Sequence, residues 1–434
     1  MTYVVCLIYV AIVYLRPGEL VPAWADLHIA AIALTVAGVT AAVSLVMEPR
    51  RFANLPNDLC FLGFCLASIL SNPANGNLGA GYAAFLKLLP LIGFYLLIRL
   101  AVRTVPQLRW LIVVLVVLTL FQATNGIIQY WTGVGVGGTT AVMEGAAQPD
   151  PDLLGGSDVG GVRRIRGTGI FGDPNDLAMS LVLVFPFLFS GILSGDPGLV
   201  RRVLGLGALA IVSYSLFLTQ SRGGLVGLAA LGVAYAYRRF GRVTALIAAV
   251  LVVGAVLAGP GRIHEMTSSE DSAQGRIQAW SAGIEMLKSS PVLGVGFGEF
   301  ITHHERVAHN SFVHVFAEVG LIGSFFFVGM FYWFFVGNGS ARNVAGAAGS
   351  PLALDIWASG IGVTVCACFL SKQFVPVLYV PLALGAVRMS AEQQPDHEAP
   401  VQRWWDWLLV LCISLGVVVA TYVAVRTLLV WSRF

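Results

Sequence analysis

The sequence His303-His304-Glu305-Arg306-Val307-Ala308-His309-Asn310-Ser311-Phe312 leads directly into an apolar run that extends from Phe312 to Val336. About 20 apolar residues are enough to span a bilayer as a helix, so this run predicts a membrane helix that begins at the polar stretch. Four of the seven histidines of the chain lie between His303 and His314. Polar side chains at the mouth of a membrane helix are costly to maintain, and the stretch is therefore a candidate functional site.

The composition of the whole chain indicates the same class of protein. Of its 434 residues, 57% are hydrophobic and 11% are charged, whereas soluble domains carry about 25% charged residues. The net charge of +3 at pH 7 is small, and no basic tract appears, which argues against a nucleic acid partner. The sequence therefore predicts an all-α, polytopic integral membrane protein whose surroundings are membrane lipids.

Apolar segments recur along the chain and predict about 12–13 transmembrane helices in a single transmembrane domain that covers 1–434. The segments 3–15 and 374–388 are the weakest members of the set because they are short. The expected spans are 3–15, 27–47, 57–71, 81–100, 108–130, 176–194, 200–219, 222–238, 243–259, 311–336, 352–371, 374–388 and 407–430.

Basic residues in alternate connections set the expected orientation, because cytoplasmic loops of membrane proteins are enriched in Lys and Arg. A cytoplasmic N-terminus places all of these residues inside: Arg50, Arg51, Arg99, Arg103, Arg109, Arg201, Arg202, Arg238, Arg239, Arg242, Arg342, Arg388 and Arg403. Two long polar segments, 132–172 and 260–310, then lie outside the cytoplasm. The second contains an amphipathic stretch from Gly275 to Ser290, whose apolar residues lie at helical spacing and predict a helix on the bilayer or on the bundle. These residues are Ile277, Trp280, Ile284 and Leu287.

Three arginines beside glycines on the outward face are candidates for binding phosphate groups: Arg166, Arg222 and Arg276. Arg222 lies in a very short connection, on the side where the positive-inside rule disfavours a cation, so it needs a partner or a function. A guanidinium group stays charged and matches phosphate oxygens in a bidentate way, which favours a lipid-linked phosphate or diphosphate. The alternative is a structural salt bridge to an outward carboxylate, for which the candidates are Glu265, Glu299 and Glu318.

Other charged residues on the outward face are weaker candidates. Lys372 lies in the turn between two spans and is a secondary candidate for phosphate binding. Asp173 and Asp176 lie where a helix should begin, so capping competes with a catalytic role for them. Arg163 and Arg164 are interpreted as solvated loop charges.

His309 is the candidate catalytic base. An imidazole titrates near neutrality, and nearby arginines lower its pKa, which keeps it neutral and able to accept a proton from a hydroxyl group. The alternative is an incidental histidine beside a helix cap, since Asn310 or Ser311 can cap the following helix. Asn310 and His314 are secondary candidates, and His314 is as readily a packed membrane histidine.

No metal or cofactor is expected from the sequence. His303, His304 and His309 lack a carboxylate at the spacing of a zinc motif, and the cysteines do not occur in zinc-binding pairs. The stretch Gly294-Val295-Gly296-Phe297-Gly298 precedes no Rossmann helix, which argues against a nucleotide site. It is interpreted as a flexible turn that lets the backbone approach a substrate.

Four motifs in order resemble the bacterial O-antigen ligase and O-antigen polymerase superfamily, over roughly 160–325. They are Arg166-Gly167-Thr168-Gly169-Ile170-Phe171-Gly172-Asp173-Pro174-Asn175-Asp176-Leu177-Ala178, Ser221-Arg222-Gly223-Gly224, Gly294-Val295-Gly296-Phe297-Gly298, and His309-Asn310-Ser311-Phe312 with Glu318-Val319-Gly320-Leu321-Ile322-Gly323. The resemblance implies a GT-C-like, metal-independent glycosyltransferase of the bacterial inner membrane. Its active site would face the periplasm, with 260–310 as a large periplasmic loop that carries part of it.

The resemblance also implies the substrates and the roles of individual residues. The donor would be a glycan on undecaprenyl diphosphate, and the acceptor a hydroxyl of lipid A-core. His309 would be the base, and Arg222, Arg276 and Arg166 would bind the diphosphate in an inverting displacement. The Asp173-Pro174-Asn175 form of its motif resembles ligase-like proteins that glycosylate proteins instead, so a protein acceptor remains open.

Two other functions remain as alternatives. An O-antigen polymerase needs the same lipid diphosphate site and a hydroxyl acceptor, and the sequence does not separate it from a ligase. A polysaccharide transporter or flippase would place ionisable residues within the spans, where Lys87 and Arg426 are the main examples. Transfer outside the cytoplasm has no nucleotide sugar available, and this favours the lipid-linked donor.

Overall fold

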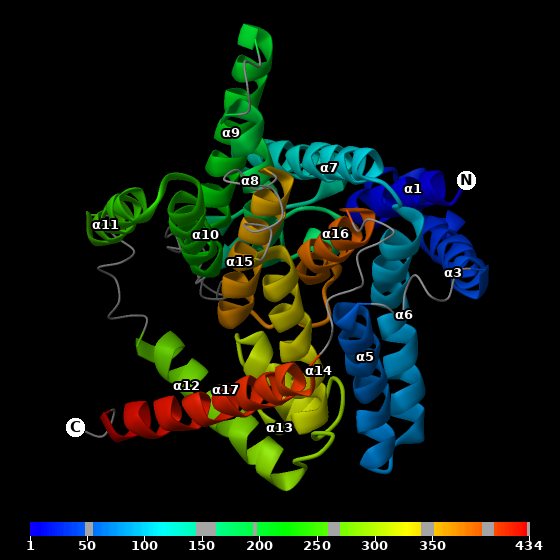
Figure 1. Ribbon diagram of the computed structural model, residues 1–434, viewed down its shortest axis with the longest axis vertical. Helices are drawn as coiled ribbons and strands as arrows, with labels where there is room; N and C mark the ends of the chain where they lie inside the picture. The colour runs from blue at the N-terminus through cyan, green and yellow to red at the C-terminus, as the bar shows by residue number, and fades with distance from the viewer. Residues whose placement is uncertain are drawn as a thin grey trace, which may run out of the picture.

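Helices form nearly all the regular structure in the computed structural model, which describes residues 1–47, 55–144, 162–193, 198–258, 270–339, 351–392 and 403–431 (Figure 1). The α-helices are α1 (Thr2–Leu15), α2 (Pro17–Leu20), α3 (Ile29–Met47), α5 (Pro56–Ala74), α6 (Leu78–Ala101), α7 (Val105–Thr132), α8 (Pro174–Leu193), α9 (Gly198–Thr219), α10 (Arg222–Phe240), α11 (Arg242–Ala258), α12 (Glu270–Ser289), α13 (Phe300–His303), α14 (Ser311–Gly339), α15 (Pro351–Phe369), α16 (Pro376–Glu392) and α17 (Trp404–Trp431). Three short 3-10 helices are η1 (Pro22–Leu27), η2 (Val136–Gly138) and η3 (Gly169–Phe171). Two strands, β1 (Val142–Glu144) and β2 (Val162–Arg164), pair antiparallel with Met143 opposite Arg163.

Every apolar segment expected to span the membrane corresponds to a helix, which confirms an all-α polytopic membrane protein. Eight helices of the described residues are long and apolar enough to cross a membrane: α3 (extended to Ala23–Met47), α6, α7, α8, α9, α14, α15 and α17 (to Leu428). The estimate of 12–13 included five further helices. Of these, α1, α11 and α16 are short, with 14, 17 and 17 residues, and α5 and α10 carry polar or charged residues near their ends.

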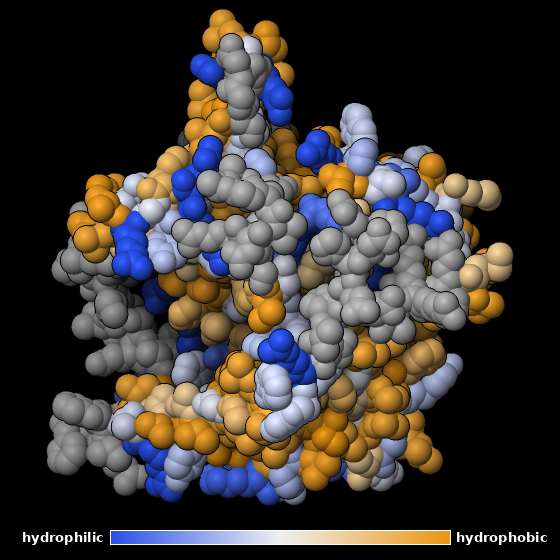
Figure 2. Space-filling view, in the orientation of Figure 1, coloured by the Kyte–Doolittle hydropathy of each residue, from blue (hydrophilic) through white to orange (hydrophobic). Residues whose placement is uncertain are grey.

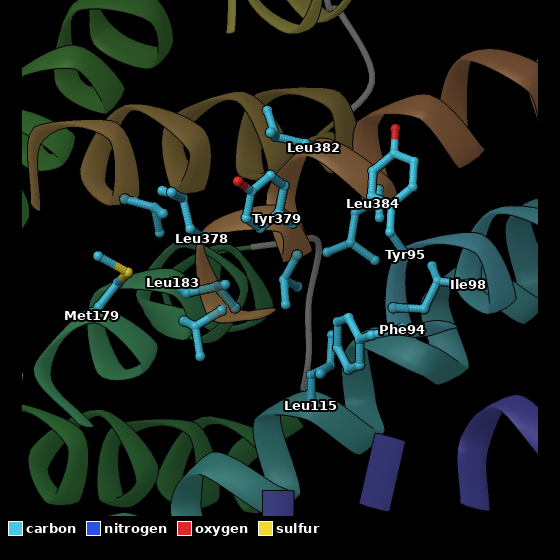
Figure 3. Packing of buried hydrophobic residues seen from close by; sticks show 14 of the residues in the cluster. Phe94, Tyr95, Ile98, Leu115, Met179, Leu183, Leu378, Tyr379, Leu382 and Leu384 are labelled. Carbon is cyan, nitrogen blue, oxygen red and sulfur yellow. The ribbon is translucent and has the colours of Figure 1, made fainter. Parts of the chain in front are cut away.

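The helix α16, whose assignment as a span was weakest, is the most enclosed of the bundle. All twelve residues from Val377 to Arg388 are buried, and the helix contacts α5, α6, α7, α8, α14 and α15. Its sequence is apolar on every side, as a helix surrounded by other helices requires. Figure 3 shows Leu378, Tyr379 and Leu382 of this helix among residues of its neighbours.

Other helices expose their apolar side chains at the periphery. In the most apolar stretches of the spans Ala23–Met47, which contains α3, and Trp404–Leu428 of α17, only 11% and 17% of the residues are buried within the protein. The helices α9 and α11 extend from the bundle in Figure 1. Exposed apolar side chains cover these helices, for example Val39, Leu204, Leu246 and Val419. A lipid environment explains such surfaces, because lipid chains are as apolar as the side chains themselves.

The amphipathic helix α12 packs on the bundle. Ile284 and Leu287 belong to a small apolar cluster with residues of α14 and α17, and Trp280 packs against it. The helix ends at Ser289, two residues before Pro291, where the sequence predicts a stop. The expected apolar face is therefore present, and much of it contacts α14 and α17.

Three of the arginines expected in cytoplasmic connections are engaged by the protein at the bundle end opposite to the starts of α10 and α14. Arg99 is buried within α6 and donates to Asp58 at 2.9 Å. Arg388 donates to Asn338 at 3.0 Å, and Arg238 donates to the Gly339 carbonyl at 3.0 Å. Arg50, Arg51 and Arg342 lie outside the described residues.

Candidate functional site

Three helices, α8, α10 and α14, begin close together at one end of the bundle, and polar side chains cap all three starts. Asn175 N donates to Asp173 Oδ1 at 2.7 Å at the start of α8. Gly224 N donates to Ser221 Oγ at 3.2 Å at the start of α10. Phe312 N and Val313 N donate to Asn310 Oδ1 at 3.0 and 3.3 Å at the start of α14. Asn310, a secondary candidate, is thus a helix cap. Free N–H groups and the helix dipole make such helix starts favourable for anions.

The start of α8 is linked to the start of α10. Ser221 Oγ donates to Asn175 Oδ1 at 2.8 Å, and Arg164 Nη2 donates to the same oxygen at 3.1 Å. Arg164 Nε also donates to the carbonyl of Thr219 at 2.9 Å. Arg164 is therefore fixed beside Arg222, and its interpretation as a solvated loop charge is wrong.

Arg166 takes a different position from the one expected. Its Nε donates to the carbonyl of Thr140 at 2.8 Å, and its backbone N donates to Gln129 Oε1 at 3.0 Å. These contacts direct the side chain toward the segment that follows α7. Among the described residues, Arg166 makes no contact with Arg222, Arg276 or His309, so its role in diphosphate binding stays a prediction.

The start of α8 is also linked to the start of α14, through Lys372 in the turn between α15 and α16. Lys372 Nζ lies 3.0 Å from Asp176 and 3.8 Å from Asp173. Lys372 N donates to Ser311 Oγ at 2.9 Å, and Ser311 Oγ donates to the carbonyl of Leu370 at 2.6 Å. The cation expected to bind phosphate is thus already engaged by two carboxylates.

Arg222 and Arg276 are brought together from α10 and α12. Arg222 is exposed and Arg276 is partly buried. Burial lowers the pKa of Arg276, and the charge of Arg222 lowers it further. Neither guanidinium group makes an ion pair or a hydrogen bond within the part of the chain that the structure describes. Two like charges within electrostatic range of each other, with no anion among the described residues, favour binding of an anion.

The carboxylates proposed as structural partners of Arg222 are occupied elsewhere, as far as the structure describes them. Glu318 Oε1 accepts from Phe300 N at 3.1 Å and lies 3.0 Å from His314 Nε2. Glu299 accepts from Thr302 Oγ1 at 3.0 Å. Glu265 lies outside the described residues.

His309 lies in the loop just before α14, with a positive φ of 48°. Trp280 Nε1 of α12 donates to the carbonyl of Ala308 at 2.8 Å, which ties this loop to the helix that carries Arg276. Burial lowers the pKa of His309, and the charges of Arg276, Lys372 and Arg306 act in the same direction, against Asp173. The imidazole is therefore neutral at pH 7 and able to accept a proton.

The remaining histidines are engaged apart from this group. His314 is buried in α14, next to Glu318, and its ring stacks near Phe300 at 4.6 Å between centroids. His303 ends α13 and His304 follows it, and their Nδ1 atoms lie 2.9 Å from the carbonyl oxygens of Glu299 and Arg306, respectively. Of the four histidines, His309 is the one on which the charge of Arg276 of α12 acts.

The glycine-rich stretch that follows α12 contacts protein backbone. The helix α14 is interrupted at Gly320, with φ 67° and ψ −164°. Val295 N donates to the carbonyl of Ala317 at 3.0 Å, and Leu321 N donates to that of Pro291 at 2.9 Å. A side chain at Gly294 would meet the Glu318 carbonyl at 2.4 Å. The interpretation of this stretch as a turn that approaches a substrate is replaced by one in which it satisfies the opened backbone of α14.

The surface is hollowed where these elements meet. Figure 2 shows a depression between α10 and α15 above and α12 and α17 below, with hydrophilic residues beside hydrophobic ones. Sequence reasoning proposed Arg222 of α10, Arg276 of α12 and His309 before α14 as site residues, and they stay predictions. It missed Arg164 and the pairing of Lys372 with Asp176, since contacts between residues 196 positions apart leave no local signal. The available sequence signal for a cationic partner was the two aspartates near Asn175, Asp173 and Asp176.

Part of the chain is similar to a known protein family. Residues 207–328, from within α9 to within α14, match the family model described as O-antigen ligase, whereas no curated protein matches the chain. The matched segment contains Arg222, Arg276 and His309, and Arg166 and Lys372 lie outside it. The family is associated with glycosyltransferase-like ligase or polymerase activity. The chain is thus similar to the O-antigen ligase family over residues 207–328, and it is a multi-pass, all-α membrane protein.

Proposed function

We propose that the protein is an O-antigen ligase of the bacterial inner membrane that transfers a glycan from undecaprenyl diphosphate to an acceptor hydroxyl on the periplasmic face. The acceptor is a hydroxyl of lipid A-core, with a protein hydroxyl as the alternative suggested by the Asp173-Pro174-Asn175 motif. The observation that carries the proposal is the position of Arg276 on α12: its charge lowers the pKa of His309, the charge of Arg222 lowers its own pKa, and Trp280 of the same helix bonds to the loop of His309.

Arg222 and Arg276 are proposed to bind the diphosphate of the donor. Diphosphate departure places negative charge on the leaving oxygen, and cations already in position stabilise that charge without reorganisation. The two guanidinium groups have no protein anion among the described residues, in contrast to Lys372, which has two. Arg166 stays a weaker candidate, because its guanidinium group donates to the Thr140 carbonyl.

His309 is proposed as the catalytic base. A nitrogen of its neutral imidazole takes the proton of the acceptor hydroxyl while the acceptor oxygen forms a bond to the anomeric carbon of the glycan. The bond between that carbon and the diphosphate oxygen breaks, and its electron pair leaves with the diphosphate. Attack opposite to the leaving group inverts the anomeric configuration. The imidazolium that forms loses its proton to solvent when the products leave.

Reconstitution of the purified protein with undecaprenyl diphosphate-linked glycan and lipid A-core tests this proposal. We expect transfer in the wild type, and a loss of about 10²–10⁴-fold in His309→Ala. His303→Ala is the matched control, since His303 lies in the exposed part of the same loop, and it should retain activity. Normal transfer by His309→Ala would overturn the assignment of the base.

The arginines are tested in the same system. Arg222→Ala should reduce transfer by about 10²–10³-fold, and Arg222→Lys should recover part of it because the charge remains. Arg163→Ala serves as the control, since Arg163 is exposed and its Nη1 donates to the carbonyl of Tyr130. Unchanged transfer in Arg222→Ala would contradict diphosphate binding by this residue.

The same reconstitution distinguishes the related functions. Growth of the lipid-linked glycan, with no glycan on lipid A-core, would identify a polymerase. Transfer to a protein substrate alone would identify a protein glycosylation ligase. Movement of the lipid-linked glycan across the vesicle membrane, with no transfer in either acceptor assay, would favour a transporter.

A further inference from the structure

The turn 173–176, where α8 begins, contacts both the start of α10 and Lys372, which is bonded to the start of α14. Its Asn175 side chain accepts hydrogen bonds from Ser221 and Arg164, and thus lies against the start of α10. Its Asp173 and Asp176 side chains face Lys372, which is bonded through its backbone to the start of α14. One turn therefore touches the element that carries Arg222 and the element that follows His309.

The link on the arginine side depends on Arg164 and is short. From the guanidinium group of Arg164, one bond reaches the last residue of α9, Thr219, and another reaches Asn175. Ser221 bonds to the same Asn175 oxygen and caps α10 immediately before Arg222. The backbone that leads into Arg222 is consequently linked to α8 at two points, Thr219 and Ser221.

The link on the histidine side depends on Lys372 and is largely buried. The side chain of Asp176 is 9% exposed and that of Lys372 is 15% exposed, at a separation of 3.0 Å. An ion pair removed from solvent in this way is sensitive to the loss of either partner. Because Lys372 also binds Ser311 Oγ through its backbone, the pair sets the position of the helix start that follows His309 and Asn310.

We infer that the turn 173–176 is a positioning element that holds Arg222 and His309 at a fixed separation, with Arg164 and Lys372 as positioning residues that do not touch the substrate. The inference rests on the proposed function, since it assigns these residues to the alignment of the diphosphate site with the base. It removes Lys372 from the set of phosphate-binding candidates, because Asp173 and Asp176 already hold its charge.

The two links act on different steps, and this makes the inference testable. A displaced Arg222 weakens binding of the donor, which appears in its KM. A displaced His309 slows the chemical step, which appears in kcat with a small change in the KM of the donor. A displacement of about 1 Å reduces a rate by about 100-fold when the reacting groups must be aligned. A general loss of folded protein lowers the apparent kcat and leaves KM unchanged, so the variants are compared at equal amounts of folded protein.

The experiment compares Arg164→Met and Lys372→Met with matched controls in reconstituted vesicles, at equal amounts of folded protein. The control for the first is Arg163→Met, on the same strand, and for the second Lys288→Met, whose exposed ion pair with Glu285 lies on α12. We expect Arg164→Met to raise the donor KM about 10-fold or more, and Lys372→Met to lower kcat about 10- to 100-fold. The controls should resemble the wild type.

Exchange of the ion pair gives a rescue that a general structural defect would not show. The double variant Asp176→Lys with Lys372→Asp restores opposite charges at the same place, and it should recover part of the kcat that Lys372→Met loses. Equal effects of both variants on KM and kcat, or no recovery in the exchanged pair, would overturn the inference.

A second measurement separates this inference from the proposed function. If the wild type transfers no glycan, the proposed function fails, and binding of undecaprenyl diphosphate is then measured directly in the same proteins. Arg164→Met should still weaken that binding about 10-fold or more relative to Arg163→Met. Equal affinities in the two variants would overturn the positioning role of Arg164.

Discussion

Arginines at the two ends of the bundle have opposite environments. At one end, Arg99, Arg238 and Arg388 donate to protein oxygens, and Arg99 is fully buried against Asp58. At the other end, the charge of Arg222 acts on Arg276, and neither guanidinium group has a hydrogen bond to the described residues. The difference separates arginines that stabilise the fold from arginines that are available to a ligand.

Burial explains why the two environments differ. A charge removed from water needs a partner of opposite sign with good geometry, and Asp58 provides this for Arg99, helped by a hydrogen bond from Tyr95 Oη at 2.9 Å. Two exposed or half-buried cations keep part of their hydration, and the cost of their mutual repulsion is offset when an anion binds. Changes at one end should therefore affect stability, and changes at the other should affect activity.

The largest expected effect is at the paired end. Asp58→Ala leaves Arg99 buried without its carboxylate partner, and should destabilise the protein by about 3–5 kcal/mol. Thermal unfolding in detergent and the amount of protein in the membrane are the measurements. Glu285→Ala is the control, because it breaks an exposed pair worth about 0–1 kcal/mol. Equal losses in the two variants would remove the distinction between buried and exposed pairs.

The next effect concerns the backbone that supports the site end. Gly320→Ala should destabilise the protein by about 1–3 kcal/mol, because its φ is 67° and a Cβ would lie 2.4 Å from the carbonyl oxygen of Val292. The glycine-rich stretch after α12, which bonds to the backbone of α14 around Gly320, should also become easier to cleave by protease. Gly416→Ala is the control, since a Cβ there meets nothing within 4 Å. Similar behaviour of both variants would show that the interruption of α14 tolerates a side chain.

A smaller effect is expected in the pH dependence of the proposed transfer. The base acts when neutral, so activity falls as the pH decreases through its pKa, and burial together with Arg276 places that pKa below the ordinary 6.5. Arg276→Gln removes a positive charge, which lets the pKa rise and moves the acid limb of kcat/KM to higher pH. Asp173→Asn should move the limb to lower pH, because Asp173 raises this pKa. Limbs at the same pH in both variants would contradict this electrostatic account.

The smallest expected effect is a gain in stability at the site end. Arg222→Gln relieves the repulsion between Arg222 and Arg276, so the ligand-free protein should melt about 1–2 °C higher. Undecaprenyl diphosphate should raise the melting temperature of the wild type and have little effect on the variant. A lower melting temperature in the ligand-free variant would show that Arg222 has a stabilising partner, like the arginines at the other end.

Local sequence signals predicted much of the fold. Each apolar segment became a helix, and Pro291 marked the end of α12, because hydrophobic length and backbone preference are properties of a few consecutive residues. The number of spans was less certain, since a helix such as α16 is short for a bilayer and apolar because helices surround it. Length and composition do not distinguish a lipid neighbour from a helix neighbour.

The sequence by itself determined the class of the protein and the chemistry available at Arg222, Arg276 and His309, since residue type decides which groups carry charge and which accept protons. Only the tertiary structure decided which of these groups meet. It brought Arg164 to the start of α10 and directed Arg166 to Thr140. It also paired Lys372 with Asp176 and bound Ser311 to the backbone of Lys372. These contacts join residues far apart in the chain, and their energy depends on packing and solvent exclusion that no local pattern encodes.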